Sequence, residues 1–342
     1  MRNKYVVYLI LLLGLSSCGN DRDTQKQRFL IRGNEALSQQ NYREATRFYN
    51  EALKIDSCYS PAWNNLGVTR FEQKQYGKAL EAYDAALACN PEDVEAILNR
   101  TNAYYETNQL YRAEDDIAYL IRNMPDSSEL HFRLGLVHAK MHKFEAAIND
   151  FSTAIQLDAL NMDAFVNRGT VYYYMNRLGD ARKDLNRARN SGEQIGNTYN
   201  ALALIAAEDD SLDLALQYIQ TALSAEPMQP YFLNNRGYIH LLRGETDLSR
   251  ADIDQSITLD PDNAWAYRNK ARWYHSNGNY EEAIRLYLQA LKKDTFIQKI
   301  HIFLGDSYHA NGQQQEACRV WKQALEMGEA GAEQRLEENK CR

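Results

Sequence analysis

One amide side chain recurs in this sequence at a fixed spacing. Asparagine occupies five positions whose numbers differ by 34, 68, 68 and 34: Asn65, Asn99, Asn167, Asn235 and Asn269. A carboxamide carries a hydrogen-bond donor and an acceptor together, so it can pair with the N–H and the C=O of one peptide unit. If one fold repeats at this interval, these amides form a row that suits the backbone of an extended polypeptide.

Four histidines have spacings that could suit a metal ion. His138 and His142 have the spacing of two zinc ligands one turn apart on a helix, but Ala139 stands where a metallopeptidase helix has glutamate. His275 and His309 are separated by the same interval as Asn65 and Asn99, and simple surface placement competes with a ligand role for that pair. The sequence contains no G-x-S-x-G elbow, Walker loop or dinucleotide-binding glycine fingerprint. We therefore expect no catalytic site, no cofactor and no metal site.

The elements that must position these residues repeat along the chain at the same interval. One unit contains, in order, Trp63, Leu66, Gly67, Ala79, Tyr83 and Pro91. We call the positions within residues 26–331 that lie whole multiples of 34 residues from Gly67 the Gly67 column. Each of them is glycine, or alanine at Ala203 and Ala271, and only Thr101 is larger. This order and spacing resemble the tetratricopeptide repeat, a helix–turn–helix unit. Nine such repeats fill residues 26–331 without an insertion.

The resemblance implies an all-α fold, a right-handed α-solenoid of about nine tetratricopeptide repeats, with residues 332–342 as a short C-terminal cap. In such repeats a small residue on the first helix lets the second helix approach closely, and a large residue beside it fills the gap. The composition agrees, because the 342 residues include only 6 prolines and 17 glycines and many helix-forming residues.

The resemblance also predicts a binding groove, because the first helices of tetratricopeptide repeats line the concave surface. The groove residues that we expect are Asn64, Asn65, Asn99, Asn102, Asn167, Asn234, Asn235, Asn269, Tyr105, Tyr173, Tyr238, Trp265, Arg268 and Arg272. The amide row resembles the asparagine ladder with which the superhelix of O-linked N-acetylglucosamine transferases holds peptide backbone. Asparagine is also common at this position in the family, so inherited consensus explains the row equally well. Glu72 and Glu129 lie toward the start of the groove and Arg272 and Lys299 toward its end. This distribution would orient a charged ligand, and simple solvation of an exposed face is the alternative explanation.

The charge of the chain narrows the class of partner. The net charge is −7, and the 39 basic residues are interspersed with 46 acidic ones without a long basic run. Such a pattern gives no electrostatic footprint for nucleic acid. We therefore expect other proteins or peptide segments as partners.

The first residues indicate a targeting signal. Arg2 and Lys4 precede an apolar run over residues 5–15, which is about half of the ~20 residues that a membrane-spanning helix needs. The segment Leu-Ser-Ser-Cys that ends at Cys18 resembles a bacterial lipobox, in which the cysteine is lipidated and begins the mature protein. An ordinary secretion signal and a retained anchor are the alternatives.

The lipobox resemblance implies a signal peptide over residues 1–17, a lipid on Cys18 and a tether over residues 18–25. Gly19 stands where many lipoproteins kept at the inner membrane have aspartate, which favours the outer membrane of a bacterial envelope. The membrane would then be contacted through the lipid anchor only.

Four further cysteines would face an oxidising compartment after export: Cys58, Cys89, Cys318 and Cys341. Cys58 and Cys89 could lie near each other in the repeat fold, but the sequence alone does not establish the geometry of a bridge, so we treat all four as unpaired by default. The function that these observations favour is a non-catalytic, envelope-anchored scaffold or adaptor that holds peptide segments of other proteins. A carbohydrate-binding lipoprotein that uses the aromatic groove residues is the second hypothesis.

Overall fold

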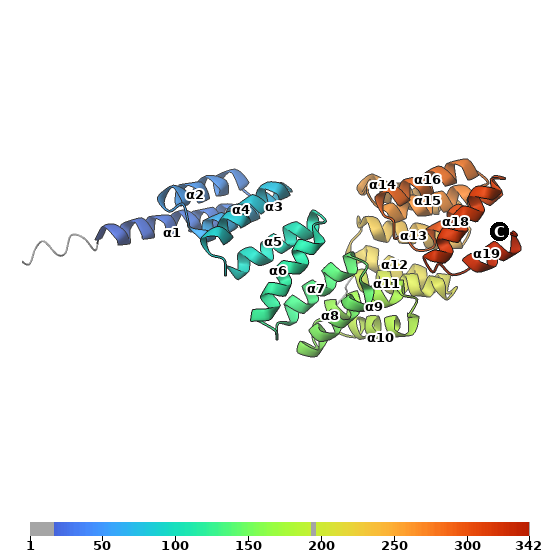
Figure 1. Cartoon of the computed structure of the whole chain (residues 1–342), viewed down its shortest axis with the longest axis horizontal. Helices are drawn as coiled ribbons and strands as arrows, with labels where there is room; N and C mark the ends of the chain where they lie inside the picture. The colour runs from blue at the N-terminus through green and yellow to red at the C-terminus, as the bar shows by residue number, and fades with distance from the viewer. Residues whose placement is uncertain (1–16, 193–195, 342) are drawn as a thin grey trace, which may run out of the picture. The chain divides into compact units, whose positions relative to one another are not determined.

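The chain is built from helices throughout the part that the structure describes. The computed structural model describes residues 17–192 and 196–341, with side chains from residue 21 onward. Every regular element in these ranges is an α-helix, which confirms the all-α fold (Figure 1). The helices form two compact units, Met1–Leu157 and Asp158–Arg342. None of the described helices is both long and apolar enough to cross a membrane.

The predicted signal peptide lies almost entirely outside the described residues. The structure does not describe residues 1–16 of this segment. It also does not describe the side chain of Cys18, so lipidation stays a prediction. The first described helix, α1, spans Ser17–Ser38 and therefore includes residues 18–25, which we expected to form a tether.

The first unit consists of four helical hairpins. Their helices are α1 Ser17–Ser38, α2 Tyr42–Ile55, α3 Ser60–Glu72, α4 Tyr76–Cys89, α5 Val94–Glu106, α6 Leu110–Asn123, α7 Ser128–Lys140 and α8 Phe144–Leu157. Each helix packs on the next one along the chain, and α3 also contacts the first helices of the hairpins on either side, α1 and α5. This packing is that of an α-solenoid.

The second unit contains five hairpins and a last short helix. Its helices are α9 Met162–Tyr174, α10 Leu178–Arg189, α11 Gly196–Glu208, α12 Leu212–Ala225, α13 Pro230–Leu242, α14 Thr246–Leu259, α15 Ala264–Ser276, α16 Tyr280–Lys293, α17 Ile300–Ala310, α18 Gln314–Glu326 and α19 Ala332–Glu338. The first helices α9, α11, α13, α15 and α17 contact one another in that order. They form a continuous inner layer, and this layer carries the candidate site.

In the hairpins that have glycine in the Gly67 column, close approach of the two helices depends on that glycine. A Cβ on Gly67 would lie 2.4 Å from Cε1 of Tyr83, and one on Gly305 would lie 2.4 Å from Cδ1 of Trp321. The two rings are each 1% exposed, so they have no space into which to move. Glycine is therefore needed because a buried ring of the second helix lies directly on the backbone of the first.

The turn inside each hairpin uses a left-handed residue. Positive φ angles recur at the repeat interval, at Gln40, Lys74, Asn108, His142, Asn176, Asp210, Gly244, Gly278 and Gly312. Glycine adopts this conformation readily and asparagine and aspartate tolerate it, whereas glutamine and lysine do so at a cost. The packing of the two helices therefore imposes the turn at Gln40 and Lys74 against local preference.

The structure corrects the expectation that the cysteines stay unpaired. Cys58 is bonded to Cys89 and Cys318 to Cys341, with Cα atoms 5.3 Å apart in each pair. Sequence separations of 31 and 23 residues become short distances only once neighbouring elements pack, so spacing alone could not reveal the bridges. The second bridge ties the chain end beyond α19 to α18.

The last hairpin departs from the repeat frame. First helices begin at residues 60, 94, 128, 162, 196, 230 and 264, but α17 begins at Ile300, two residues later than this series requires. Lys299 precedes it with a φ of 59° and no side-chain cap. The linker after α16 is therefore longer, and its last residues extend over the inner layer.

Candidate functional site

Amide side chains of the second unit form a hydrogen-bonded row on the inner helices. Nδ2 of Asn235 donates to Oδ1 of Asn200 at 2.8 Å, and Nδ2 of Asn234 donates to Oδ1 of Asn235 at 3.1 Å. Nδ2 of Asn269 donates to Oδ1 of Asn234 at 2.9 Å, and the Arg268 guanidinium donates to Oδ1 of Asn269 at 2.9 and 3.1 Å. A charged donor therefore begins a row of bonds that all point the same way and strengthen one another.

The first unit repeats the same arrangement. Nδ2 of Asn99 donates to Oδ1 of Asn64 at 3.0 Å, Nδ2 of Asn64 to Oδ1 of Asn65 at 3.2 Å, and Nδ2 of Asn65 to Oδ1 of Asn34 at 2.8 Å. The bond between Asn99 and Asn64 spans 35 residues, which is the offset between facing positions on neighbouring first helices. We call both rows the amide rows.

These bonds correct the expected placement of three asparagines. Asn64, Asn234 and Asn269 are 2%, 1% and 1% exposed, so most of each side chain lies between neighbouring first helices, although Asn234 also lines the cavity described below. Their amides are already paired within the chain, and a peptide would have to break those bonds to use them. The amide rows therefore fasten one repeat to the next, and peptide binding by their half-buried members stays a prediction.

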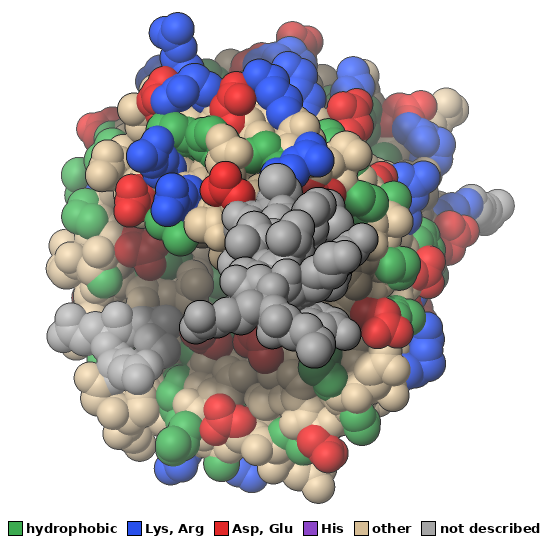
Figure 2. Space-filling model, turned by 90° about the vertical axis from the view of Figure 1, so that its left-hand side faces the viewer, with side chains coloured by type: hydrophobic (Ala, Val, Ile, Leu, Met, Phe, Trp, Pro, Cys, Tyr) green, Lys and Arg blue, Asp and Glu red, His purple; other side chains and the backbone are tan. Residues whose placement is uncertain are grey.

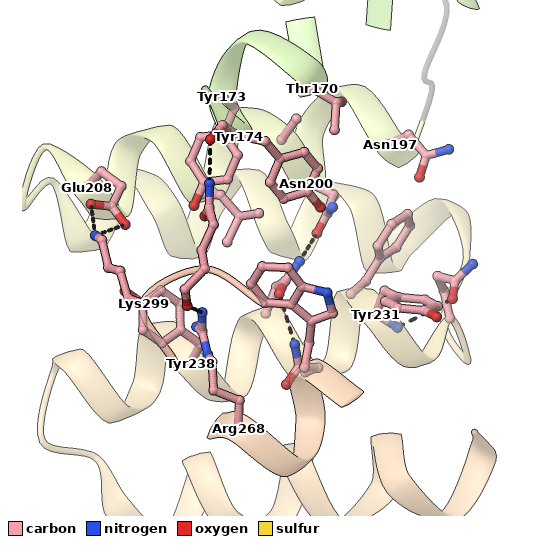
Figure 3. Close-up of a pocket in the computed structure, with 18 of the residues that line it drawn as sticks. Thr170, Tyr173, Tyr174, Asn197, Asn200, Glu208, Tyr231, Tyr238, Arg268 and Lys299 are labelled. Carbon is pink, nitrogen blue, oxygen red and sulfur yellow. Dashed lines mark hydrogen bonds and ion pairs between the residues drawn. The ribbon is translucent and has the colours of Figure 1, made fainter. Parts of the chain in front are cut away.

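The inner layer of the second unit encloses a cavity of about 330 Å³, which we call the inner cavity (Figure 3). Its walls come from α9, α11, α13, α15 and α17 and from the two residues before α17. Eight of the groove residues expected from the sequence line it: Asn167, Tyr173, Asn234, Asn235, Tyr238, Trp265, Arg268 and Arg272. The sequence thus predicted much of this lining.

Aromatic rings make one wall of the inner cavity. The ring centroids of Tyr174 and Trp265 are 6.0 Å apart, and those of Tyr173 and Tyr174 are 5.6 Å apart. Burial raises the pKa of both tyrosines, so their hydroxyl groups stay neutral at physiological pH. Tyr231, at the opposite side of the cavity from Glu208 in Figure 3, is 47% exposed. The wall can accept a planar or apolar group and orient it with hydroxyl and amide groups.

Two arginines of α15 supply positive charge to the inner cavity. Arg268 is 6% exposed, and burial together with the charge of Arg272 lowers its pKa. The Arg272 guanidinium lies 4.9 Å from the ring centroid of Tyr238 and 4.4 Å from that of Phe303. Arginine keeps its proton at neutral pH even in such surroundings. The cavity therefore contains two permanent cations.

The residues before α17 close one end of the inner cavity, and we call Gln298 and Lys299 the strap. Nε2 of Gln298 donates to the main-chain oxygen of Tyr174 at 2.8 Å, and Arg268 donates to the main-chain oxygen of Gln298 at 3.1 Å. Nζ of Lys299 lies 3.1 and 3.3 Å from the carboxylate oxygens of Glu208, as the dashed lines in Figure 3 show. A second cavity of about 500 Å³ lies on the other side of the strap.

Other residues expected in the groove are engaged locally. Oδ1 of Asn102 accepts from Arg133 at 2.8 Å. Lys140 donates to the main-chain oxygen of Tyr105 at 2.7 Å and lies 3.9 Å from the centroid of its ring. Asn167 donates to the main-chain oxygen of Asp163 on its own helix at 2.8 Å. Each side chain thus has an internal partner.

The histidine pair of the last two hairpins does not converge. Nδ1 of His275 bonds to Oγ of Ser307 at 2.8 Å, and Nδ1 of His309 bonds to Oε1 of Gln314 at 2.7 Å. Within residues 17–192 and 196–341 no group of three or more histidine, cysteine, aspartate or glutamate side chains is arranged to hold a metal ion.

Sequence reasoning missed several contributors to the inner cavity, among them Asn200, Glu208 and Gln298. Asn200 is 35 residues before Asn235, so the offset found in the amide rows would have revealed it. Gln298 enters the site because α17 begins late, and the sequence signal is the absence of proline or a capping residue before that helix. Glu208 lies four repeat intervals after Glu72, in the same column, so the repeat frame could have placed it in the groove, whereas its pairing with Lys299, 91 residues away, had no signal.

The face drawn in Figure 2 is the end of the molecule at which α1 lies in Figure 1. On the face drawn in Figure 2, acidic and basic side chains are interspersed and hydrophobic ones are scattered among them.

Comparison with known proteins places the repeats in a family. Sequence models described as tetratricopeptide repeat match residues 60–93, 132–195, 231–294 and 268–332, which together make up more than half of the chain. The chain belongs to the tetratricopeptide repeat family. Proteins with tetratricopeptide repeats are protein-interaction scaffolds and are generally non-catalytic.

Relatives with tetratricopeptide repeats differ widely in overall size. The chain is 22% identical over 256 residues to Protein CTR9 homolog of Arabidopsis thaliana, covering 75% of this chain and 21% of that protein. It is 26% identical over 166 residues to Hsp70-Hsp90 organizing protein 1 of Glycine max, covering 45% of this chain and 28% of that protein. The chain therefore spans about a fifth to a quarter of these relatives.

Solved structures with tetratricopeptide repeats share the fold. The Cut9–Hcn1 assembly of the APC/C matches with a TM-score of 0.60 and 17% identity, over 86% of this chain and 59% of that one. PilF of Pseudomonas aeruginosa matches with a TM-score of 0.53 and 20% identity, over 62% of this chain and 96% of that one. At these identities the likeness concerns the fold alone.

Proposed function

We propose that this chain is a non-catalytic scaffold that binds a segment of another protein in the inner cavity. The observation that carries the proposal is the composition of the lining, in which tyrosine, tryptophan and arginine converge on a space of about 330 Å³. These three residue types dominate the binding energy of protein interfaces. Membership of a family of interaction scaffolds supports the same function.

A site-specific cross-link tests the scaffold. Tyr231 lines the cavity and is 47% exposed, so a photoreactive residue there reaches a bound segment. Leu248 on α14 is 55% exposed and is not part of the lining, which makes it the matched control position. We expect the Tyr231 position to capture a defined partner that Leu248 does not capture, and Trp265→Ala to reduce that capture. Equal capture at both positions would contradict the proposal.

We also propose that the protein is held at the bacterial envelope, in the outer membrane, by a lipid on Cys18. The basic residues Arg2 and Lys4, the lipobox-like segment ending at Cys18 and Gly19 support this. The two disulfide bridges fit an oxidising compartment. We expect palmitate to label the wild-type protein but not Cys18→Ser, and globomycin to block maturation. Labelling of Cys18→Ser would disprove the anchor.

The second candidate function is carbohydrate binding, which the neighbouring rings of Tyr174 and Trp265 favour because sugar faces stack on aromatic rings. Amides that can bond to sugar hydroxyl groups lie beside these rings, among them Asn167 and Asn235. A glycan array separates the two functions. A reproducible glycan signal that Trp265→Ala abolishes, with no protein captured from Tyr231, would favour carbohydrate.

A further inference from the structure

The inner cavity contains two arginines whose charge no carboxylate balances among the described residues. The hydrogen bonds of Arg268 go to neutral acceptors, namely the amide of Asn269 and the main-chain oxygen of Gln298. Nη1 of Arg272 is buried and has no hydrogen-bond partner in the described part of the chain. Charged side chains are rarely buried unless they are paired, because taking a charge out of water is costly.

Other arginines on the first helices of the second unit are paired. Arg168 donates to both carboxylate oxygens of Asp184 at 2.7 and 2.9 Å, and Arg236 donates to both oxygens of Asp252 at 2.7 Å. In these two hairpins an aspartate of the second helix therefore neutralises the arginine of the first helix. The arrangement at Arg268 and Arg272 is different.

The surroundings of the arginine pair hold the cations in place without neutralising them. The Arg268 guanidinium lies 4.8 Å from the ring centroid of Trp265, and Arg272 lies against Tyr238 and Phe303. Contacts of this kind offset part of the desolvation cost but bring no negative charge. Among the described lining residues Glu208 is the one acid, and it is paired with Lys299. The lining thus keeps a net positive charge in a chain whose net charge is −7.

We propose that Arg268 and Arg272 bind a carboxylate of the partner segment, with an aromatic or apolar group next to that carboxylate lying against Trp265 and Tyr174. This inference rests on the proposed scaffold function and names the chemistry that the scaffold selects. A guanidinium presents planar N–H groups that match the two oxygens of a carboxylate, as Arg168 already does with Asp184. The carboxylate can belong to a chain end or to an acidic side chain.

Small probes that differ only in charge test the proposal on the full-length protein. N-acetyl-tryptophan has a carboxylate beside an indole ring, and N-acetyl-tryptophan amide is its neutral counterpart. We expect the carboxylate probe to bind at least about tenfold more tightly in ligand-observed NMR titrations, as a charge-assisted bond to a desolvated guanidinium predicts. N-acetyl-aspartyl-tryptophan amide carries its carboxylate on a side chain, so its affinity distinguishes an acidic side chain from a chain end.

Three variants show whether Arg272 is responsible. Arg272→Gln should abolish the preference for the charged probe, and Arg272→Lys should retain most of it. Because Nη1 of Arg272 donates to no acceptor among the described residues, the glutamine variant removes a charge without breaking a bond at that atom. Circular dichroism checks that the variant is folded. Arg187→Gln on α10 removes the same charge from an exposed position outside the cavity and should leave the preference unchanged.

The outcomes separate this inference from the scaffold itself. Equal affinity for the two tryptophan probes, no binding of either, or an unchanged preference in Arg272→Gln would overturn the carboxylate site. If the Tyr231 cross-link still captures a partner in that case, the scaffold function stands without it. If the probe preference holds but no protein is captured, the carboxylate site stands and the protein partner does not.

Discussion

The side-chain amide of Gln298 donates a 2.8 Å hydrogen bond to the main-chain oxygen of Tyr174, which is 124 residues earlier in the chain. The bond joins the residues before α17 to the end of α9, so it connects the last hairpin of the second unit to the first. In the same place Arg268 donates to the main-chain oxygen of Gln298. The strap thus fixes the width of the inner cavity at one end.

Replacing Gln298 should loosen the strap. We expect Gln298→Ala to lower the free energy of unfolding by about 1 kcal/mol, the usual net value of one hydrogen bond. Hydrogen exchange should accelerate in the strap and at the end of α9. Gln217→Ala, an exposed position on α12, serves as the control. Unchanged exchange near the strap would show that this bond does not hold the cavity.

The amide row predicts unequal effects for two asparagines. Asn234→Ala removes the acceptor of Asn269 and the donor to Asn235, so we expect a loss of about 1–3 kcal/mol in the free energy of unfolding. Asn167→Ala removes one bond within its own helix and should cost less than about 1 kcal/mol. Urea unfolding of the two variants measures the difference. Equal losses would argue against the amide row as a fastening between repeats.

The first disulfide should contribute strongly to stability. Closing a loop of 31 residues stabilises by about 3–4 kcal/mol in the chain-entropy estimate, so Cys58→Ser with Cys89→Ser should lower the midpoint of unfolding. Removing the Cys318–Cys341 bridge should instead release mainly α19, because that helix follows the last hairpin. Hydrogen exchange that rises only in α19 would support this division. An unchanged midpoint without the first bridge would contradict the prediction.

Two glycines of the same hairpin should respond in opposite directions to alanine. Gly67→Ala places a methyl group 2.4 Å from the buried Tyr83 ring, and we expect a loss of about 1–3 kcal/mol. Gly77 on α4 has no atom within 4 Å of the position that a methyl group would take, so Gly77→Ala should gain up to about 1 kcal/mol from helix propensity. Thermal unfolding of both variants provides the measurement. A stable Gly67→Ala would refute the close-packing explanation.

Stability should fall slightly in mild acid because of His275. Burial lowers the pKa of His275 below its ordinary value of 6.5, with nearby Asp306 opposing the shift and Arg272 adding to it. The unfolded state therefore binds the proton more readily. The free energy of unfolding should decrease as the pH falls below 6.5, until the folded-state pKa is passed. His275→Gln should reduce this slope, and His142→Gln in an inter-helix turn is the control. An equal slope in wild type and His275→Gln would exclude this origin.

Much of the fold follows from the repeat frame alone. Glycine in the Gly67 column and aromatic residues such as Tyr83 and Trp321 specify the hairpins, because only a small residue admits a ring at that distance. The disulfides do not follow from the frame. Cys58 and Cys89 meet only when two hairpins stack, and their separation of 31 residues does not by itself establish the geometry of a bridge.

The sequence by itself determined the helices, their pairing and which columns face the inner layer, because those features depend on residues within one or two repeats. It also placed Trp265, Arg268 and Arg272 in the predicted groove, and these residues line the inner cavity. Only the tertiary structure decided that the asparagines bind each other, that the strap crosses to Tyr174 and that the arginine pair lacks a counter-charge among the described residues. Those properties depend on groups 35 to 124 residues apart, and they exist only after the hairpins have packed.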